Sequence, residues 1–253
     1  MLRDTTSSCP NHWVRAVVAG AILSGTTRNL LLRKLPAEAL ALLQPHLDLV
    51  VLPRRAPLEQ PQKAIEHLYF MEQGIASVVS VNGRNSPVEI GVVGREGVTG
   101  IAIVLGSTTS PHSTFIQAAG SALRIAVKPF CSALAQSEAL RNLLLRYTHV
   151  FMVQTAHTAA ANAMGSIEER LARWLLMAQD RLDDDALPLT HDFLAIMLGT
   201  RRPGVTEAVH ALVKRGLIKA HRGVIIVADR EGLIQRAGKL YGGPEAEYQK
   251  QIP

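Results

Sequence analysis

The sequence predicts an α+β protein in three parts: an N-terminal antiparallel β-roll of the jelly-roll type, a long helix, and a C-terminal winged helix-turn-helix. Three observations favour this fold class. Short β-type runs separated by turn residues fill the first half of the chain, and an apolar stripe of near-heptad spacing follows over roughly 27 residues. Two short amphipathic helices joined by a glycine turn then occupy the last part.

We divide the chain of 253 residues into five segments. They are an N-terminal extension (1–28), the β-roll (29–135), the long helix (136–165), the winged helix-turn-helix domain (166–243) and a tail (244–253). The extension contains an apolar run, 13–23, of the length found in export signals. Asp4 and Arg15 break the usual pattern of such signals, so we expect a loosely ordered segment and not a signal peptide.

Composition restricts the function classes. The net charge is +6 and the sequence pI about 9.6, which suits a protein that binds a polyanion. The two cysteines, Cys9 and Cys131, form no disulfide framework, as is usual in a reducing cytoplasm, and are too few for an iron–sulfur or structural zinc site. No apolar run reaches the roughly 20 residues that span a bilayer. Without a catalytic motif, we expect a cytoplasmic protein that is neither an enzyme nor a metalloprotein.

In the first half, a helix pair interrupted by Pro36 begins near Asn29 and precedes the β-type runs. The runs are 47–52, 67–71, 75–81, 87–93, 113–119 and 121–127. We expect a turn at Gln73-Gly74 and a hairpin at Asn82-Gly83. Several short strands punctuated in this way are typical of an antiparallel barrel or jelly roll.

The near-heptad stripe of the long helix has about one residue per helical turn, with two candidates at some turns. It consists of Leu140, Leu143 or Leu144, Tyr147, Val150 or Phe151, Gln154, Thr158 and Ala161, and Gly165 ends the helix. We expect this stripe to form a dimer seam with a second copy of the chain, built from Leu140, Leu144, Tyr147, Phe151, Gln154 and Thr158. The alternative is that the stripe packs on the β-roll of the same chain.

The next helix begins at a capping box, because Ser166 precedes Glu169 by three residues. We expect it to run from Ile167 to about Leu182 and to bury Leu171, Trp174, Leu175 and Ala178. Three aspartates, 183–185, follow the helix. We interpret them as a solvated linker, since nothing in the pattern fixes a metal-binding geometry.

Residues 189–219 have the layout of a DNA-reading helix-turn-helix. Apolar residues at 193, 194, 197 and 198 line one face of a first helix, and Gly199 suits the left-handed turn that follows. Thr200 is the expected N-cap of the second helix, with Pro203 in its first turn. The expected buried face of the second helix is Val205, Ala208, Val209, Leu212 and Val213.

A wing is predicted directly after the second helix. Gly216 closes that helix, and two short strands flank a turn at His221-Arg222-Gly223. The alternative is an ordinary helical pair whose charges are only solvated. The expected DNA-binding residues are Thr190, His191, Thr200, Arg201, Arg202, Thr206, Glu207, His210, Lys219, His221 and Arg222.

Between about residues 30 and 240 the chain resembles the Crp/Fnr superfamily of bacterial transcription regulators. Three blocks carry the resemblance: Gly94-Arg95-Glu96-Gly97, the stretch 166–178, and the stretch 189–218. It looks closest to a branch that also shares Tyr69-Phe70 through Val79, Ser110-Pro111-His112 and the run 169–180. The resemblance implies a β-roll like a cyclic-nucleotide-binding domain and a cytoplasmic homodimer. It also implies a pseudo-palindromic double-stranded DNA operator and contact with RNA polymerase.

By position, Arg202 matches the principal base-contacting arginine of the family. An arginine can hold guanine O6 and N7 with two hydrogen bonds. Pro203 stands where many members have a glutamate, and Glu207 where many have a second arginine. Glu207 can accept a hydrogen bond from cytosine or face water. Because of these two departures, the operator sequence best known for the family cannot be assumed for this chain. The alternative function is a ligand-binding sensor with weak or lost DNA reading, for which Pro203-Gly204 gives slight support.

Members of the family that bind cyclic AMP hold it with a glycine-glutamate pair and an arginine followed by a small hydroxyl residue. Glu96 is the candidate for the ribose contact. However, 97–120 contains no arginine or lysine, and His112-Ser113 stands where the family has the arginine and its hydroxyl neighbour. The expected effector pocket is Gly94, Glu96, Gly97, His112 and Ser113. We expect an unknown effector and not cyclic AMP, because a mostly neutral histidine is a poor phosphate ligand. Haem ligation by His112 or His67 is a weaker alternative.

Overall fold

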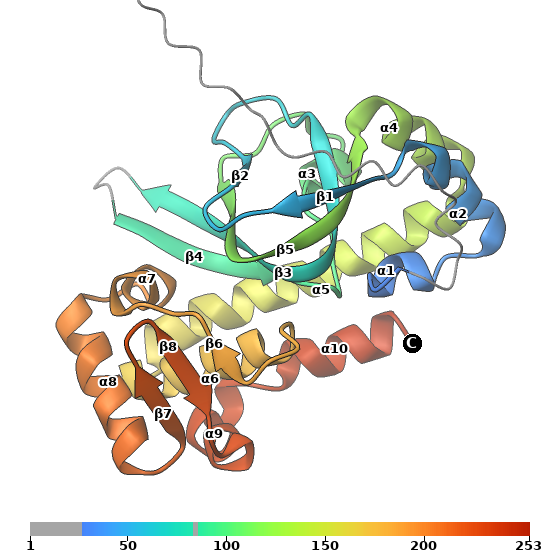
Figure 1. Cartoon of the computed structure of the whole chain (residues 1–253). Helices are drawn as coiled ribbons and strands as arrows, with labels where there is room; N and C mark the ends of the chain where they lie inside the picture. The colour runs from blue at the N-terminus through green and yellow to red at the C-terminus, as the bar shows by residue number, and fades with distance from the viewer. Residues whose placement is uncertain (1–26, 83–85) are drawn as a thin grey trace, which may run out of the picture.

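The computed structural model describes residues 27–82 and 86–253. In Figure 1 the β-roll lies above, the C-terminal domain lies below, and a long helix, α5 (Glu138–Met164), runs along the junction between them. Most of the expected extension, residues 1–26, lies outside the described residues. In the described part, no helix is both long and apolar enough to cross a membrane.

The β-roll contains one antiparallel sheet in the order β1-β5-β3-β4, with β2 attached to β5. Its elements are α1 (Leu30–Arg33), α2 (Ala37–Leu43), a 3-10 turn (Gln44–His46), β1 (Asp48–Leu52), β2 (Pro57–Glu59), β3 (His67–Asn82), β4 (Ser86–Val93), α3 (Ile101–Val104), β5 (Ser113–Ala126) and α4 (Val127–Gln136). The expected helix pair around Pro36 is therefore confirmed. The hairpin after Asn82 is also present, since Asn82 pairs with Ser86, although 83–85 are outside the described residues.

The expected turn at Gln73-Gly74 is wrong. The runs 67–71 and 75–81 form one continuous strand, β3. The runs 113–119 and 121–127, also expected as separate strands, form a second continuous strand, β5, which pairs with β3. The pairing register shifts around Gly74, whose φ is +82°, so the glycine makes a bulge. A Cβ on Gly74 would lie 2.5 Å from the carbonyl oxygen of Ala118. Glycine here lets two long strands bend together without breaking.

The expected dimer seam on α5 is also wrong, and the alternative holds: the stripe packs within the chain. Leu140, Leu144 and Tyr147 are at most 3% exposed. The two polar members bind neighbouring elements. The Gln154 amide donates to the Val92 carbonyl at 3.2 Å and accepts from its N–H at 2.7 Å, which fastens α5 to the sheet. Thr158 accepts from Arg173 at 3.1 Å.

The C-terminal domain begins with α6 (Ile167–Gln179), and both hydrogen bonds of its capping box are present. The domain continues with β6 (Ala186–Leu187), α7 (His191–Met197), α8 (Arg202–Lys214), β7 (Ile218–His221), β8 (Val224–Val227), α9 (Arg230–Ala237) and a 3-10 turn (Gly238–Leu240). The last residues, expected as a tail, form α10 (Gly243–Gln251). This helix lies along α5 in Figure 1, and Ile252 beyond it is buried.

The C-terminal domain is docked on the sheet through a mixed interface. The Trp174 indole on α6 donates to the Glu89 carboxylate on β4 at 2.6 Å. The rings of Phe115 and Phe193 meet edge to face at 6.1 Å. Asp183 is exposed, as expected of a solvated linker, and its carboxylate also accepts from Arg28 and Arg95 at 2.7 Å. The two halves therefore share apolar contacts, a buried carboxylate and an ion cluster.

Candidate nucleic-acid interface

The helix-turn-helix is formed by α7 and α8. The Thr190 hydroxyl accepts from the N–H of Phe193 at 3.3 Å and so begins α7. Gly199 has a φ of +54°, in the left-handed region where glycine is cheapest. The N-cap of α8 is Arg201, which makes no side-chain cap, and not the expected Thr200. Because Pro203 lacks an N–H, its place in the first turn leaves one fewer donor to be capped.

The two faces of α8 differ as the sequence predicts, with one exception. Val205, Ala208, Val209 and Leu212 are buried against the domain, whereas Val213 is 39% exposed. On the outer face, Arg201, Arg202, Glu207 and His210 are exposed, and Thr206 is half-buried. The helix therefore presents two arginines at its N-terminal end, where a reading helix enters the major groove.

Contacts to α7 fix part of this outer face. A ring nitrogen of His191 lies 3.0 Å from the Thr206 hydroxyl, which also donates to the Arg202 carbonyl at 3.1 Å. Thr206 is thus engaged within the motif and not free for a base. The Arg202 guanidinium lies 3.4 Å from Asp192, and both side chains are more than half exposed. Such a pair is worth little in water, so Arg202 is available to a polyanion.

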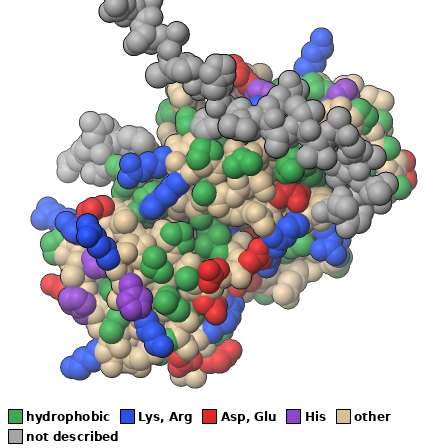
Figure 2. Space-filling model, viewed as in Figure 1, with side chains coloured by type: hydrophobic (Ala, Val, Ile, Leu, Met, Phe, Trp, Pro, Cys, Tyr) green, Lys and Arg blue, Asp and Glu red, His purple; other side chains and the backbone are tan. Residues whose placement is uncertain are grey.

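A three-stranded sheet, β6-β8-β7, forms the wing beside α8. Lys219, His221 and Arg222 are exposed on it, and Gly223 turns the chain with a φ of +76°. Between α7, α8 and the wing lies an open groove of about 510 Å³. Six predicted residues line it: Thr190, His191, Arg202, His210, His221 and Arg222. Figure 2 shows basic and histidine side chains gathered over this part of the surface.

The other predicted residues lie around the groove and do not line it. Thr200 and Arg201 border a separate hollow beside Pro87 and Val88 of β4. Gly204, which suggested a drifted reading helix, has a packing reason: a Cβ there would lie 2.8 Å from the Ile167 side chain on α6. The helix α8 is continuous through Pro203 and Gly204. The sequence feature that supported lost DNA reading is therefore explained by domain packing.

The predicted effector residues do not form one pocket. His112 lines a cavity of about 60 Å³ inside the β-roll, together with Glu59, Thr99 and Gly100. Glu96 does not line it, and no arginine or lysine of the described residues does. Ser113 is half-buried on β5. Burial lowers the pKa of His112 and raises that of Glu59, whose carboxylate accepts from the Gly100 N–H at 3.0 Å. Sequence reasoning missed Glu59, which lies in a short strand without a motif.

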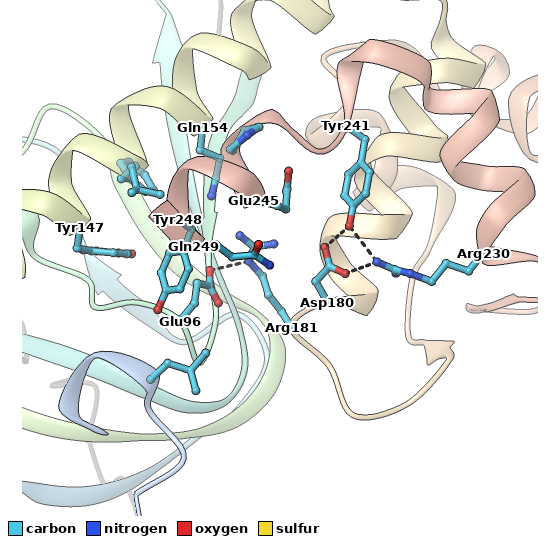
Figure 3. Close-up of a pocket in the computed structure, with 14 residues that line it drawn as sticks. Glu96, Tyr147, Gln154, Asp180, Arg181, Arg230, Tyr241, Glu245, Tyr248 and Gln249 are labelled. Atoms are coloured by element: carbon cyan, nitrogen blue, oxygen red, sulfur yellow. Dashed lines mark hydrogen bonds and ion pairs between the residues drawn. The ribbon is translucent and has the colours of Figure 1, made fainter. Parts of the chain in front are cut away.

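Glu96 instead lines a larger cavity, of about 460 Å³, between the β-roll, α5 and the C-terminal domain (Figure 3). Its carboxylate accepts from Arg181 at 2.7 Å. A Cβ on Gly94 would lie 2.6 Å from the Arg181 side chain, and one on Gly97 would overlap the Tyr147 hydroxyl. The Gly94–Gly97 motif is therefore explained by close packing against Tyr147 of α5 and Arg181 just after α6, which was not expected from the sequence.

Helix α5 has a second, outward-facing stripe that sequence reasoning did not identify. Leu145 and Met152 are 43% and 62% exposed. Ala156, Ala159 and Ala163 are also exposed, so the five residues follow one another at steps of seven, four, three and four. This is heptad spacing. We call these five residues the outer stripe.

Comparisons with known proteins agree with this geometry. Residues 169–236 match the family model of the Crp-like helix-turn-helix domain. The fold is similar to FixK2 from Bradyrhizobium japonicum, with a TM-score of 0.66, 13% identity, and coverage of 76% of this chain and 98% of that one. It is also similar to a transcriptional regulator of the CRP family from Thermus thermophilus, with a TM-score of 0.63, 18% identity, and coverage of 74% and 96%.

A third similar structure comes from Eubacterium rectale and is described as a transcriptional regulator of the Crp/Fnr family. Its TM-score is 0.65 at 15% identity, and the match covers 82% of this chain and 97% of that one. No curated protein matches the sequence. At these identities the structural likeness concerns the fold alone.

Proposed function

We propose that this chain belongs to the Crp/Fnr superfamily and is a homodimeric, sequence-specific DNA-binding transcription regulator. The match of residues 169–236 to the Crp-like helix-turn-helix model and the likeness of the fold support this proposal. The observation that carries the proposal is the groove between α7, α8 and the wing. Two exposed arginines line it, Arg202 from α8 and Arg222 from the turn of the wing. A duplex seated there would meet a base-reading side chain from α8 and a phosphate-binding one from the wing.

Arg202 is the proposed base reader, since it stands in the first turn of α8 and its ion-pair partner Asp192 is exposed. His210 lies two turns further along the same outer face. Arg222, His221 and Lys219 supply phosphate contacts, which fix position but carry no sequence information. Contact with RNA polymerase, and a cytoplasmic location, are proposed from the family resemblance.

The proposed dimer uses the outer stripe of α5. The first stripe is covered by the β-roll, whereas the outer stripe exposes Leu145 and Met152 at heptad spacing with small alanines after them. Two such helices can approach closely along the alanines. A two-fold dimer places two reading helices on half-sites about one DNA turn apart.

The dimer is tested by Met152→Asp, which puts a charge on the outer stripe at a position already 62% exposed. The matched control is Leu105→Asp, on the β-roll, where the side chain is 60% exposed. We expect monomers for Met152→Asp and dimers for the control in sedimentation equilibrium. A dimer that survives Met152→Asp would contradict this interface.

The small cavity inside the β-roll gives no support to cyclic AMP as the signal. It measures about 60 Å³, well below the about 300–1,000 Å³ usual for small-molecule pockets. The described residues that line it include no cation for a phosphate. We propose that the effector is a different molecule.

The central experiment is selection of DNA from a random duplex pool at physiological salt. Enrichment of a roughly two-fold-symmetric site is expected, and Arg202→Ala should relax the preference at one position in each half-site. If binding shows no sequence preference with wild-type protein, with and without a cell extract of small molecules, the sequence-specific part of the proposal is overturned.

A further inference from the structure

The cavity of about 460 Å³ between the β-roll, α5 and α10 has the size of a small-molecule site, because such pockets usually measure about 300–1,000 Å³. It is separate from the β-roll interior, although Phe151 borders both. Its walls come from three parts of the fold: Glu96 from the β-roll, Tyr147 from α5, and Arg181 and α10 from the C-terminal half (Figure 3).

Both arginines that line this cavity are paired with carboxylates of the chain. Arg181 is 8% exposed in its side chain and holds Glu96 at 2.7 Å. Arg230 holds Asp180 at 2.7 Å, and Tyr241 donates to the other oxygen of that carboxylate at 2.7 Å. Arg181 and Arg230 are therefore each already bound to a carboxylate. A phosphate or carboxylate ligand would have to displace a carboxylate from one of them.

The third carboxylate of the lining, Glu245, has no cationic partner within salt-bridge distance among the described residues. One of its oxygens accepts from the N–H of Gly242 at 3.0 Å, which begins α10. The lining thus holds three carboxylates and two guanidinium groups. Its net charge favours a neutral or positively charged ligand over an anion.

The uncharged part of the lining is aromatic. Tyr147, Tyr241, Tyr248 and Phe151 border the cavity, with Val150 and Pro244 between them. Aromatic rings favour a flat aromatic partner, by stacking or edge contact, and their faces attract cations. The Tyr248 hydroxyl is buried without a hydrogen-bond partner among the described residues, so its edge of the cavity has unused hydrogen-bonding capacity.

We propose that this cavity binds a small aromatic molecule that is neutral or carries one positive charge. Because the ligand would touch the β-roll, α5 and the C-terminal domain at once, it stabilises their present arrangement. If the proposed function holds, the same ligand changes DNA affinity by its preference for this arrangement.

The test uses three probes with one ring system: tryptamine as the cation, indole as the neutral molecule and indole-3-acetate as the anion. Calorimetry on the full chain without DNA should show tryptamine and indole binding, and indole-3-acetate binding at least about fivefold more weakly. Glu245→Gln, which keeps the amide oxygen for the α10 cap, should weaken tryptamine and strengthen the anion. Equal binding of all three probes would overturn the charge preference.

A blocking variant locates the site. Gln249 is exposed at the rim, so Gln249→Trp can fill the opening without disturbing the core, and we expect tryptamine binding to fall about tenfold or more. The matched control is Lys250→Trp, also exposed on α10 but not part of the lining. Unchanged binding in Gln249→Trp, or no probe binding at millimolar concentration, would overturn the proposal. Because DNA is absent, neither result depends on whether the chain reads DNA.

Discussion

The groove between α7, α8 and the wing and the cavity between the β-roll, α5 and α10 are both lined by arginines, which differ in exposure and pairing. Arg202 and Arg222 are exposed, and the ion pair of Arg202 with Asp192 joins two exposed side chains. Arg181, in contrast, is buried and bound to Glu96 at 2.7 Å. The difference shows that pairing and burial decide what an arginine does. An exposed arginine attracts a polyanion, and a buried, paired arginine joins two parts of the fold.

The largest effect should come from breaking the buried pair. Arg181→Ala leaves the Glu96 carboxylate, 17% exposed, without its cationic partner. Loss of one member of a fully buried pair costs about 3–5 kcal/mol in the free energy of unfolding, which is the upper bound here. Urea denaturation followed by circular dichroism measures this loss. The double variant Arg181→Met/Glu96→Leu removes both charges and should recover most of the stability. A single variant as stable as wild type would show that the pair is solvated in solution.

Arg202→Ala should have little effect on stability and a large effect on DNA affinity. The side chain is 67% exposed, so the free energy of unfolding should change by less than about 0.5 kcal/mol. Affinity for a selected operator should fall by about 1–3 kcal/mol, because one two-pronged base contact is lost. Fluorescence anisotropy with operator and unrelated duplexes measures both affinities. Equal losses on the two duplexes would assign Arg202 to phosphate binding.

A buried carboxylate at the docking interface should make stability depend on pH. Burial raises the pKa of Glu89 to about 7, although hydrogen bonds from Ser77 and Trp174 oppose the shift and the nearby Arg173 and Arg181 do so as well. The folded state then holds the proton more tightly than the unfolded state. The stability from this proton is complete below about pH 4.5 and is lost as the pH rises through about 7.

The variant Glu89→Gln isolates this effect, since the amide keeps an oxygen for Trp174 and carries no charge. Between pH 5 and 8, the free energy of unfolding of wild type should fall more steeply than that of Glu89→Gln, in urea titrations at each pH. Histidines such as His67 and His112 titrate in both proteins and cancel in the difference. Parallel pH profiles would indicate that water reaches Glu89.

The smallest expected effect belongs to the wing. Arg222→Ala should weaken binding to all duplexes alike, and the slope of log affinity against log salt should decrease by about 1, the contribution of one phosphate contact. Titrations at several salt concentrations give this slope. A changed base preference would show that Arg222 contacts a base, as proposed for Arg202, and would contradict its assignment to phosphate.

Sequence alone determined what depends on local chemistry. The glycine turn at Gly199, the capping box at Ser166 and the buried face around Leu194 and Val205 follow from backbone freedom, donor satisfaction and helical spacing. The order of β-roll, long helix and winged domain could be predicted for the same reason. So could the exposed arginines of α8, since a helix with one apolar face presents its charges on the other.

Only the tertiary structure decided which surfaces meet. Periodicity identified the apolar stripe of α5 but not its partner, and the β-roll covers it, which leaves the outer stripe around Met152 exposed. Glu96 and His112 were assigned to one pocket by analogy, yet Glu96 pairs with Arg181, which lies far along the chain just after α6. Burial and pairing between distant segments depend on how the domains dock. That docking is set by the shapes and charges of whole surfaces, which local spacing does not encode.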